Sequence, residues 1–181
     1  MAAAGSIAPL HRQFRGALFA LLAGNTAYYL FAGTVSKGLD AAAWFVLLSL
    51  FALETGWPGA LRTRGARIAV RGARLAAAAA IAAAGIAYLI EKNWLDVLNT
   101  ALWIAIVVML EVEVRFPRAV KRYRTGFAAT AAVLYTGLVL LVFAWLWRGE
   151  WFDAYDALLW IIAFALIEMD LLKAASAGRT A

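Results

Sequence analysis

Long apolar segments constrain the fold of this chain more than any other feature of its sequence. Hydrophobic residues make up 65% of the 181 residues, whereas a soluble domain of this size is nearer half apolar. An apolar helix of about 20 residues crosses the hydrocarbon core of a bilayer. Six apolar segments are present, two of them shorter than this: residues 16–34, 40–54, 75–90, 94–114, 126–147 and a last one that ends near Asp170. The sequence therefore predicts an all-α integral membrane protein, with six transmembrane helices in a single domain over residues 1–181.

Most basic residues lie on one side of the predicted helices. Fourteen of the 17 Lys and Arg fall in the N-terminal segment, the second and fourth connections and the C-terminal segment. The other three connections hold only Lys37, Lys92 and Arg148. Cytoplasmic loops carry such an excess of positive charge, so we expect both termini to be cytoplasmic and the number of spans to be even. We expect a multi-pass protein of a bacterial inner (plasma) membrane.

A pattern of polar residues recurs in the second, fourth and sixth apolar segments. An acid or amide is followed four residues later by Trp and fourteen residues later by a carboxylate. The three copies are Asp40, Trp44 and Glu54; Asn99, Trp103 and Glu113; and Asp156, Trp160 and Asp170.

Two shifts along the chain bring the three copies into register. The first shift places Asp40 on Asn99, and the second places Asn99 on Asp156. The first shift also places Trp57-Pro58 on Phe116-Pro117. This indicates three helical hairpins, residues 15–58, 74–117 and 131–174. Repeats of two spans keep the same orientation in the membrane, so the sequence predicts a pseudo-threefold bundle of hairpins.

The repeated residues share one face of each helix, because their spacing follows the helical period. Asp40 and Glu54 are about 21 Å apart along a helix, which is short against roughly 30 Å of hydrocarbon, so one carboxylate per repeat would lie at membrane depth. Three such faces around an axis would form an outer polar ring, an apolar plug and an inner acidic ring. Carboxylate rings attract cations, and an apolar constriction can gate. The hypothetical ion pathway contains Asp40, Glu54, Asn99, Glu111, Glu113, Asp156, Glu168 and Asp170, and its apolar gate or anchor contains Trp44, Trp103 and Trp160.

The same residues also have an ordinary structural interpretation. Trp near a helix end is commonly an interfacial anchor, and Asp40 and Asp156 could be helix N-caps. The inner acids could pair with arginines of the basic connections, as Glu111 could with Arg115 at i and i+4. In that case the three faces would form a solid core rather than a pathway.

The second connection is a stripe of arginines. Arg64, Arg67, Arg71 and Arg74 recur at the spacing of one helix face. The segment is either an interfacial helix or an extension of the third spanning helix, and in both cases we expect contacts with anionic lipid headgroups at the cytoplasmic face. Since no recognised nucleic-acid-binding module accompanies the stripe, nucleic acid is not an expected partner.

Two further features concern packing. The third apolar segment is mostly alanine, and small residues let helix backbones approach closely, so we expect this helix inside the bundle. Asn25 and Thr26 have no polar counterparts in the other repeats. We expect them to bond an adjacent helix rather than a substrate.

Residues that usually carry catalysis are scarce. The chain has no Cys and one histidine, His11, in the basic N-terminal segment. This excludes a thiolate nucleophile and nearly excludes histidine-based catalysis and haem ligation. We therefore expect no enzyme activity, catalytic residue, cofactor or metal. An enzyme would have to work with carboxylates alone, such as a metal held by Glu111, Glu113, Glu168 and Asp170.

The leading functional hypothesis is a channel or transporter for a small cation or proton that uses the repeated carboxylates. The alternative is a non-transporting membrane subunit or scaffold of a larger complex. Membrane lipids, a second copy of the chain or a membrane complex are the expected partners.

Overall fold

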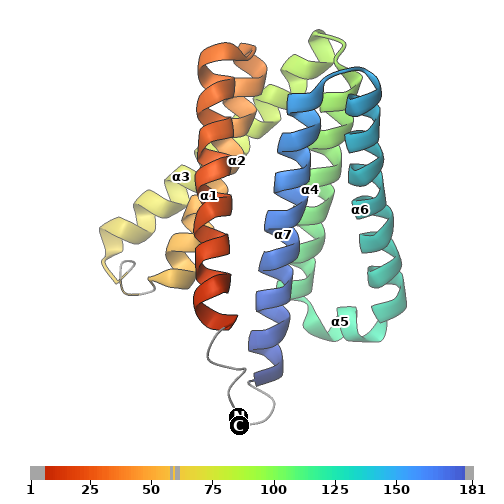
Figure 1. Cartoon of the computed structure of the whole chain (residues 1–181). Coiled ribbons are helices and arrows are strands. Elements are labelled where there is room, and N and C mark those ends of the chain that lie inside the picture. Colours follow the sequence, from red (N-terminus) through yellow and green to blue (C-terminus); the bar gives the residue numbers. More distant parts are fainter. Residues whose placement is uncertain (1–6, 58, 60–61, 178–181) are drawn as a thin grey trace. The chain divides into compact units, whose positions relative to one another are not determined.

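The computed structural model describes the backbone of residues 7–57, 59 and 62–177. Side chains are described within these ranges, except at residues 7–12, 55–56, 114 and 167–177. In this part of the chain the secondary structure is helical, without strands, which confirms the all-α prediction. The helices are α1 (Ile7–Ala32), α2 (Val35–Gly56), α3 (Arg64–Ile90), α4 (Trp94–Arg115), α5 (Pro117–Arg122), α6 (Arg124–Trp147) and α7 (Trp151–Ala177) (Figure 1).

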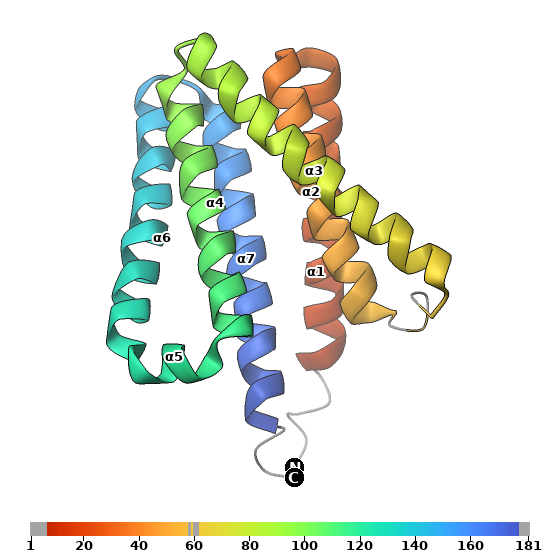
Figure 2. The same ribbon diagram turned by 180° about the vertical axis from the view of Figure 1, so that it is seen from behind.

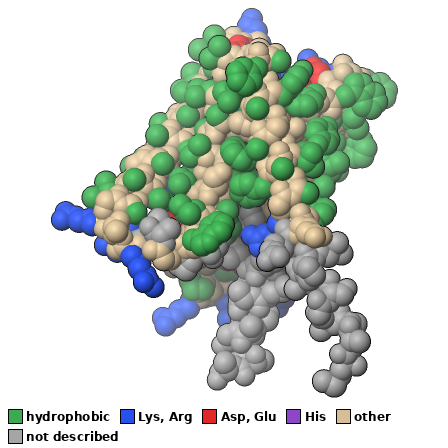
Figure 3. Space-filling view, turned by 60° about the vertical axis from the view of Figure 1, so that its left-hand side comes forward, with side chains coloured by type: hydrophobic (Ala, Val, Ile, Leu, Met, Phe, Trp, Pro, Cys, Tyr) green, Lys and Arg blue, Asp and Glu red, His purple; other side chains and the backbone are tan. Residues whose placement is uncertain are grey.

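Among the described residues, four helices are long and apolar enough to cross a membrane, namely α2, α3, α4 and α6. The coarse prediction of a multi-pass membrane protein agrees with this, whereas the six-span topology and the cytoplasmic termini stay predictions. In the space-filling view, hydrophobic side chains cover much of the visible face, and Lys and Arg lie at its margins (Figure 3). A surface of this kind suits lipid rather than water.

Local chemistry accounts for most helix boundaries. The Thr34 hydroxyl accepts a hydrogen bond from the Lys37 N–H at 3.3 Å and caps α2, and Thr63 caps α3 through the Ala66 N–H at 3.1 Å. Pro117 begins α5 and separates it from α4, because proline suits the first turn of a helix but not its interior.

The start of α2 differs from the prediction. The helix begins at Val35 rather than near Asp40, because Thr34 supplies the cap. Asp40 therefore lies in the second turn of α2, and Asp156 likewise lies in the second turn of α7, which begins at Trp151. The interpretation of both aspartates as N-caps is wrong.

The helix boundaries follow the two sequence shifts. α2, α4 and α7 begin at Val35, Trp94 and Trp151, which fall on one another when Asp40, Asn99 and Asp156 are aligned. The second shift also places the end of α3 at Ile90 on the end of α6 at Trp147.

The turns after α3 and α6 also share a backbone pattern. The Lys92 and Gly149 N–H groups donate to Leu89 and Leu146 carbonyls at 3.2 and 3.1 Å. The next residues, Asn93 and Glu150, donate to Tyr88 and Trp145 carbonyls, both at 2.9 Å. Lys92 and Gly149 both have positive φ, 57° and 76°. The two turns are therefore the same turn built from different side chains.

The chain forms two compact units. One is the Ala23–Ala101 unit, and the other is the Leu102–Ala181 unit, which also includes Met1–Leu22. The division falls inside α1 and inside α4, so each of these helices contributes to both units.

In the Ala23–Ala101 unit α2 packs along α3, which Figure 2 shows from behind. The buried face of α3 is one stripe, and most of its other residues are exposed. The stripe consists of Ala77, Ile81, Ala84 and Tyr88. The expectation that the alanine-rich helix is enclosed by the bundle is therefore wrong for most of its surface. Its small residues serve one close contact, and the remaining faces are free to meet lipid.

In the Leu102–Ala181 unit α6 packs against α7. Trp103 and Trp160 both contact the ring of Phe164, with centroids 4.6 and 6.4 Å apart. α6 approaches α4 closely at Gly137, where an added Cβ would meet Leu102 Cδ1 at 3.1 Å. A side chain at position 137 would therefore require the end of Leu102 to shift.

Candidate functional site

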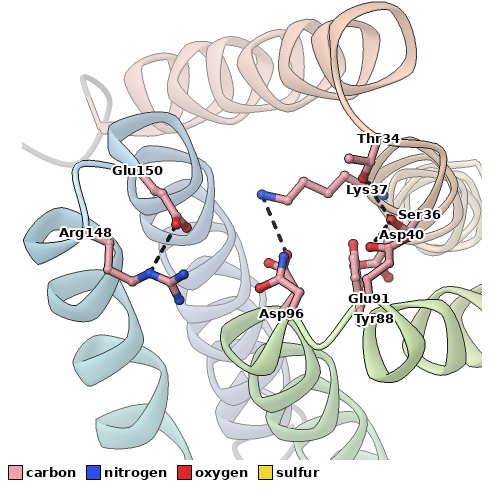
Figure 4. Close-up of polar contacts among 10 residues, drawn as sticks. Thr34, Ser36, Lys37, Asp40, Tyr88, Glu91, Asp96, Arg148 and Glu150 are labelled. Atoms are coloured by element: carbon pink, nitrogen blue, oxygen red, sulfur yellow. Dashed lines mark hydrogen bonds and ion pairs between the residues drawn. The ribbon is translucent and has the colours of Figure 1, made fainter.

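A group of polar side chains lies in the Ala23–Ala101 unit, where the start of α2 meets the turn between α3 and α4 (Figure 4). We call this group the polar cluster. Several members are almost fully buried: Tyr88 is 2% exposed, Ser36 3%, Asp96 6% and Asp40 9%. The members are Thr34, Ser36, Lys37, Asp40, Tyr88, Glu91, Asn93 and Asp96.

The first contact of the polar cluster joins the start of α2 to the end of α3. The Thr34 and Ser36 hydroxyl oxygens are 2.8 Å apart, and Ser36 Oγ donates to Glu91 Oε2 at 2.9 Å. Since Thr34 also caps α2, the helix start and the α3–α4 turn are held by one chain of hydrogen bonds.

The second contact is an ion pair between α2 and α4. Lys37 Nζ lies 3.7 Å from Asp96 Oδ2, and the side chains are 18% and 8% exposed. Asn93 Nδ2 donates to the same carboxylate oxygen. Asp96 is in the first turn of α4, where the positive end of the helix dipole also favours a carboxylate.

The third contact lies deeper in the α2–α3 interface. The Tyr88 hydroxyl donates to Asp40 Oδ2 at 3.4 Å. Tyr88 is the last residue of the buried stripe of α3, so packing of that stripe on α2 brings its hydroxyl to Asp40. Asp40 was predicted from the sequence as a residue of the ion pathway, and in the structure it is a member of the polar cluster.

Two polar side chains of α4 lie just beyond the polar cluster. Thr100 is buried, and a Cβ on Gly85 of α3 would be 3.6 Å from its Cγ2, so α3 and α4 are close at this level. Among the described residues, the Asn99 Oδ1 and Thr100 Oγ1 atoms are buried and have no hydrogen-bond partner. Asn99 was predicted from the sequence as a residue of the ion pathway, whereas Thr100 was not.

Two of the inner acids, Glu54 and Glu111, are paired with arginines as the structural alternative expects. Glu54 accepts from Arg74, and Glu111 accepts from Arg115 one helical turn later. Glu113 is exposed on α4. The side chains of Glu168 and Asp170 lie outside the described residues. Asp156 is partly buried on α7, which belongs to the other unit. The outer polar ring and the inner acidic ring, each formed by three helices, therefore stay predictions.

The three repeated tryptophans are buried. Trp44 belongs to the Ala23–Ala101 unit, and Trp103 and Trp160 belong to the other unit, where Phe164 joins them. Burial favours a plug or a core over a lipid-facing anchor. Other tryptophans are exposed at helix ends, where interfacial anchors are expected: Trp57, Trp94, Trp147 and Trp151.

The arginine stripe belongs to α3 itself. Arg64, Arg67, Arg71 and Arg74 occupy the first three turns of this continuous helix and are mostly exposed. The segment is therefore an extension of the third long helix rather than a separate interfacial one. Headgroup contacts stay a prediction for this stripe, and Arg74 also pairs with Glu54.

Sequence reasoning missed most of the polar cluster. The missed residues are Thr34, Ser36, Lys37, Tyr88, Glu91, Asn93 and Asp96. One signal was present: the shift that aligns Asp40 with Asn99 also places Lys37 on Asp96. Opposite charges at positions that the shift aligns are a reason to test for an ion pair.

Within the described residues, no group of three or more His, Asp and Glu side chains is arranged to hold a metal ion. Comparison of the chain with protein-family models, with curated proteins and with solved structures gives no match.

Proposed function

We propose that this chain is a six-span protein of a bacterial inner membrane that moves a proton or a small cation, and that Asp40 binds it. The observation that carries the proposal is the buried position of Asp40 within an apolar helix, in contact with the Tyr88 hydroxyl. A carboxylate inside a membrane segment is costly, and such residues mark ion and proton pathways.

The charge of the polar cluster supports a cationic cargo. Its acids are Asp40, Glu91 and Asp96, and its one cation among the described contacts is Lys37. A proton or a cation on Asp40 would reduce this negative charge, whereas an anion would increase it. Hydroxyl groups of Ser36 and Tyr88 supply oxygens of the kind that coordinate hard cations or relay protons.

The polar cluster also supplies a means of positioning Asp40. Ser36 binds Glu91 and Lys37 binds Asp96, so both flanks of the α2 start are held against the α3–α4 turn. Asp40 follows one helical turn later on α2. Pre-organised partners lower the cost of binding because fewer groups must be ordered when the ion arrives.

The repeat is part of the proposal. Two observations support three similar hairpins. The starts of α2, α4 and α7 align under the two sequence shifts, and the turns after α3 and α6 have the same backbone hydrogen bonds. With three hairpins the chain has six spans and both termini on the cytoplasmic side, in agreement with the charge distribution. The buried tryptophans would then form the apolar part of the pathway.

The test is ion flux into proteoliposomes. Wild-type protein is expected to carry a proton or cation flux, and Asp40→Asn is expected to remove most of it, because the substitution removes the carboxylate that binds the ion. Glu150→Gln is the matched control, because Glu150 pairs with Arg148 outside both the polar cluster and the hypothetical ion pathway, and its flux should equal that of the wild type. An absence of flux for any cation between about pH 5 and 8, where a perturbed carboxylate titrates, would refute the proposal.

One observation favours the alternative, a non-transporting subunit or scaffold. Glu54 of α2 is bound to Arg74 of α3, so this carboxylate joins two helices, as a structural residue does. This alternative predicts a stable partner after purification in a gentle detergent, and wild-type behaviour of Asp40→Asn in partner binding. A protein that carries flux without a partner would exclude it.

A further inference from the structure

An open cavity of about 350 Å³ lies between α4 and the start of α6 in the Leu102–Ala181 unit. Met109 of α4 lines one side, and Gly126, Phe127 and Thr130 of α6 line the other. Tyr123, between α5 and α6, completes the lining. The walls are mainly apolar, and the volume is within the range of about 300–1,000 Å³ that ligand sites occupy.

The chain beside this cavity is strongly basic. The guanidinium of Arg122 lies over the ring of Tyr123, with Cζ 5.5 Å from its centroid, so a cation sits directly on a lining residue. Further exposed cations lie on α5 and at the start of α6, and together they are Arg118, Lys121, Arg122 and Arg124. Among the described side chains, none of these cations pairs with a carboxylate, in contrast to Arg74 and Arg115.

We propose that the cavity binds an anionic phospholipid, with one acyl chain against Met109 and Phe127 and the phosphate on Arg122. The fork of the guanidinium matches two phosphate oxygens, and stacking on Tyr123 holds it in place. A free phosphate would use the cations but would leave the apolar cavity empty, so a lipid accounts for both features. The proposal requires that the chain lies in a membrane, and it does not depend on ion transport.

Native mass spectrometry of the detergent-purified protein tests this site. Dioleoyl phosphatidylglycerol is titrated, and dioleoyl phosphatidylcholine serves as the neutral-headgroup comparison. Arg122→Gln removes the cation at the cavity. Gly126→Leu fills the cavity, and no atom lies within 4 Å of a Cβ at this position, so the new side chain enters open space. Arg122→Gln should weaken phosphatidylglycerol binding about fivefold, the ratio expected for one lost cation at a membrane surface. Gly126→Leu should weaken it as well, because the leucine side chain takes the place of the acyl chain.

Matched controls lie in the other unit. Gly72→Leu places the same side chain on α3, again with no atom within 4 Å, and Lys92→Gln removes an exposed cation of the turn after α3, outside the arginine stripe. Both should bind phosphatidylglycerol as the wild type does. Thr130→Leu is a second way to fill the cavity if Gly126→Leu does not fold, as judged by circular dichroism and gel filtration.

Several results would overturn the proposal. Equal affinity for phosphatidylglycerol and phosphatidylcholine would show that the cations beside the cavity do not contribute to lipid binding. Full displacement of phosphatidylglycerol by inorganic phosphate would assign the site to free phosphate. Unchanged binding in both Gly126→Leu and Thr130→Leu would show that the acyl chain does not lie in the cavity. A loss of phosphatidylglycerol binding in Gly72→Leu equal to that in Gly126→Leu would show that the loss is unrelated to the cavity.

Discussion

In the turn that joins α3 to α4 and in the turn that joins α6 to α7, the backbone makes the same hydrogen bonds, but the side chains differ in kind. Tyr88 in the first turn donates its hydroxyl to Asp40, whereas the equivalent Trp145 has a buried Nε1 without a hydrogen-bond partner among the described residues. Lys37–Asp96 is largely buried, whereas Arg148–Glu150 is 54% and 33% exposed. The two turns therefore share a backbone shape and differ in the chemistry of their side chains.

The largest expected effect on stability is the loss of the Lys37–Asp96 ion pair, compared with loss of the exposed Arg148–Glu150 pair. Asp96→Ala removes the carboxylate that both Lys37 and Asn93 contact, and we expect a loss of about 2–3 kcal/mol in unfolding free energy, because these groups are mostly buried. Glu150→Ala should cost less than about 1 kcal/mol, as exposed pairs do. Thermal unfolding in detergent, followed by circular dichroism, measures both. Equal midpoints for the two variants would contradict the contrast between the turns.

A smaller effect is expected from the hydroxyl of Tyr88. Tyr88→Phe keeps the ring and removes the hydrogen bond to Asp40, so we expect a loss of about 1–2 kcal/mol. Tyr155→Phe on α7 removes an exposed hydroxyl and should change stability by less than about 0.5 kcal/mol. The same unfolding experiment serves here, and a Tyr88→Phe midpoint equal to that of the wild type would show that the hydroxyl does not stabilise the α2–α3 interface.

The smallest effects should have opposite signs at two equivalent backbone positions. Lys92 has φ 57° and Gly149 has φ 76°, a region that suits glycine and strains other residues. We expect Lys92→Gly to stabilise the chain by about 0.5 kcal/mol and Gly149→Ala to destabilise it by about 1 kcal/mol. Midpoints that move in the same direction would mean that the two turns differ in backbone as well as in side chains.

The sequence was informative about helices because their signals are local. Pro117 ends α4, apolar runs mark the long helices, and the same two shifts that align the tryptophans also align three helix starts. The start of α2 was misplaced because Ser36, Lys37 and Gly38 resemble a turn. They are helical because Thr34 caps them and the α3–α4 turn binds them.

The candidate site was only partly predictable, and for a different reason. Asp40 stood out by its recurrence, but Glu91 and Asp96 gain their meaning from contacts with residues of α2, far earlier in the chain. Periodicity shows which residues share a helix face. It does not show which helix ends meet, and here α2 meets the turn that follows α3.

The division of the chain has a consequence for biosynthesis. The Ala23–Ala101 unit is continuous in sequence, and its main contact joins helices that follow one another, α2 and α3. Chains are made from the N-terminus, and domains generally fold as units as they emerge. We therefore expect a chain arrested shortly after Ala101 to hold the α2–α3 pair already. The other unit unites Met1–Leu22 with Leu102–Ala181, so it needs residues from both sides of the Ala23–Ala101 unit and forms later than the α2–α3 pair.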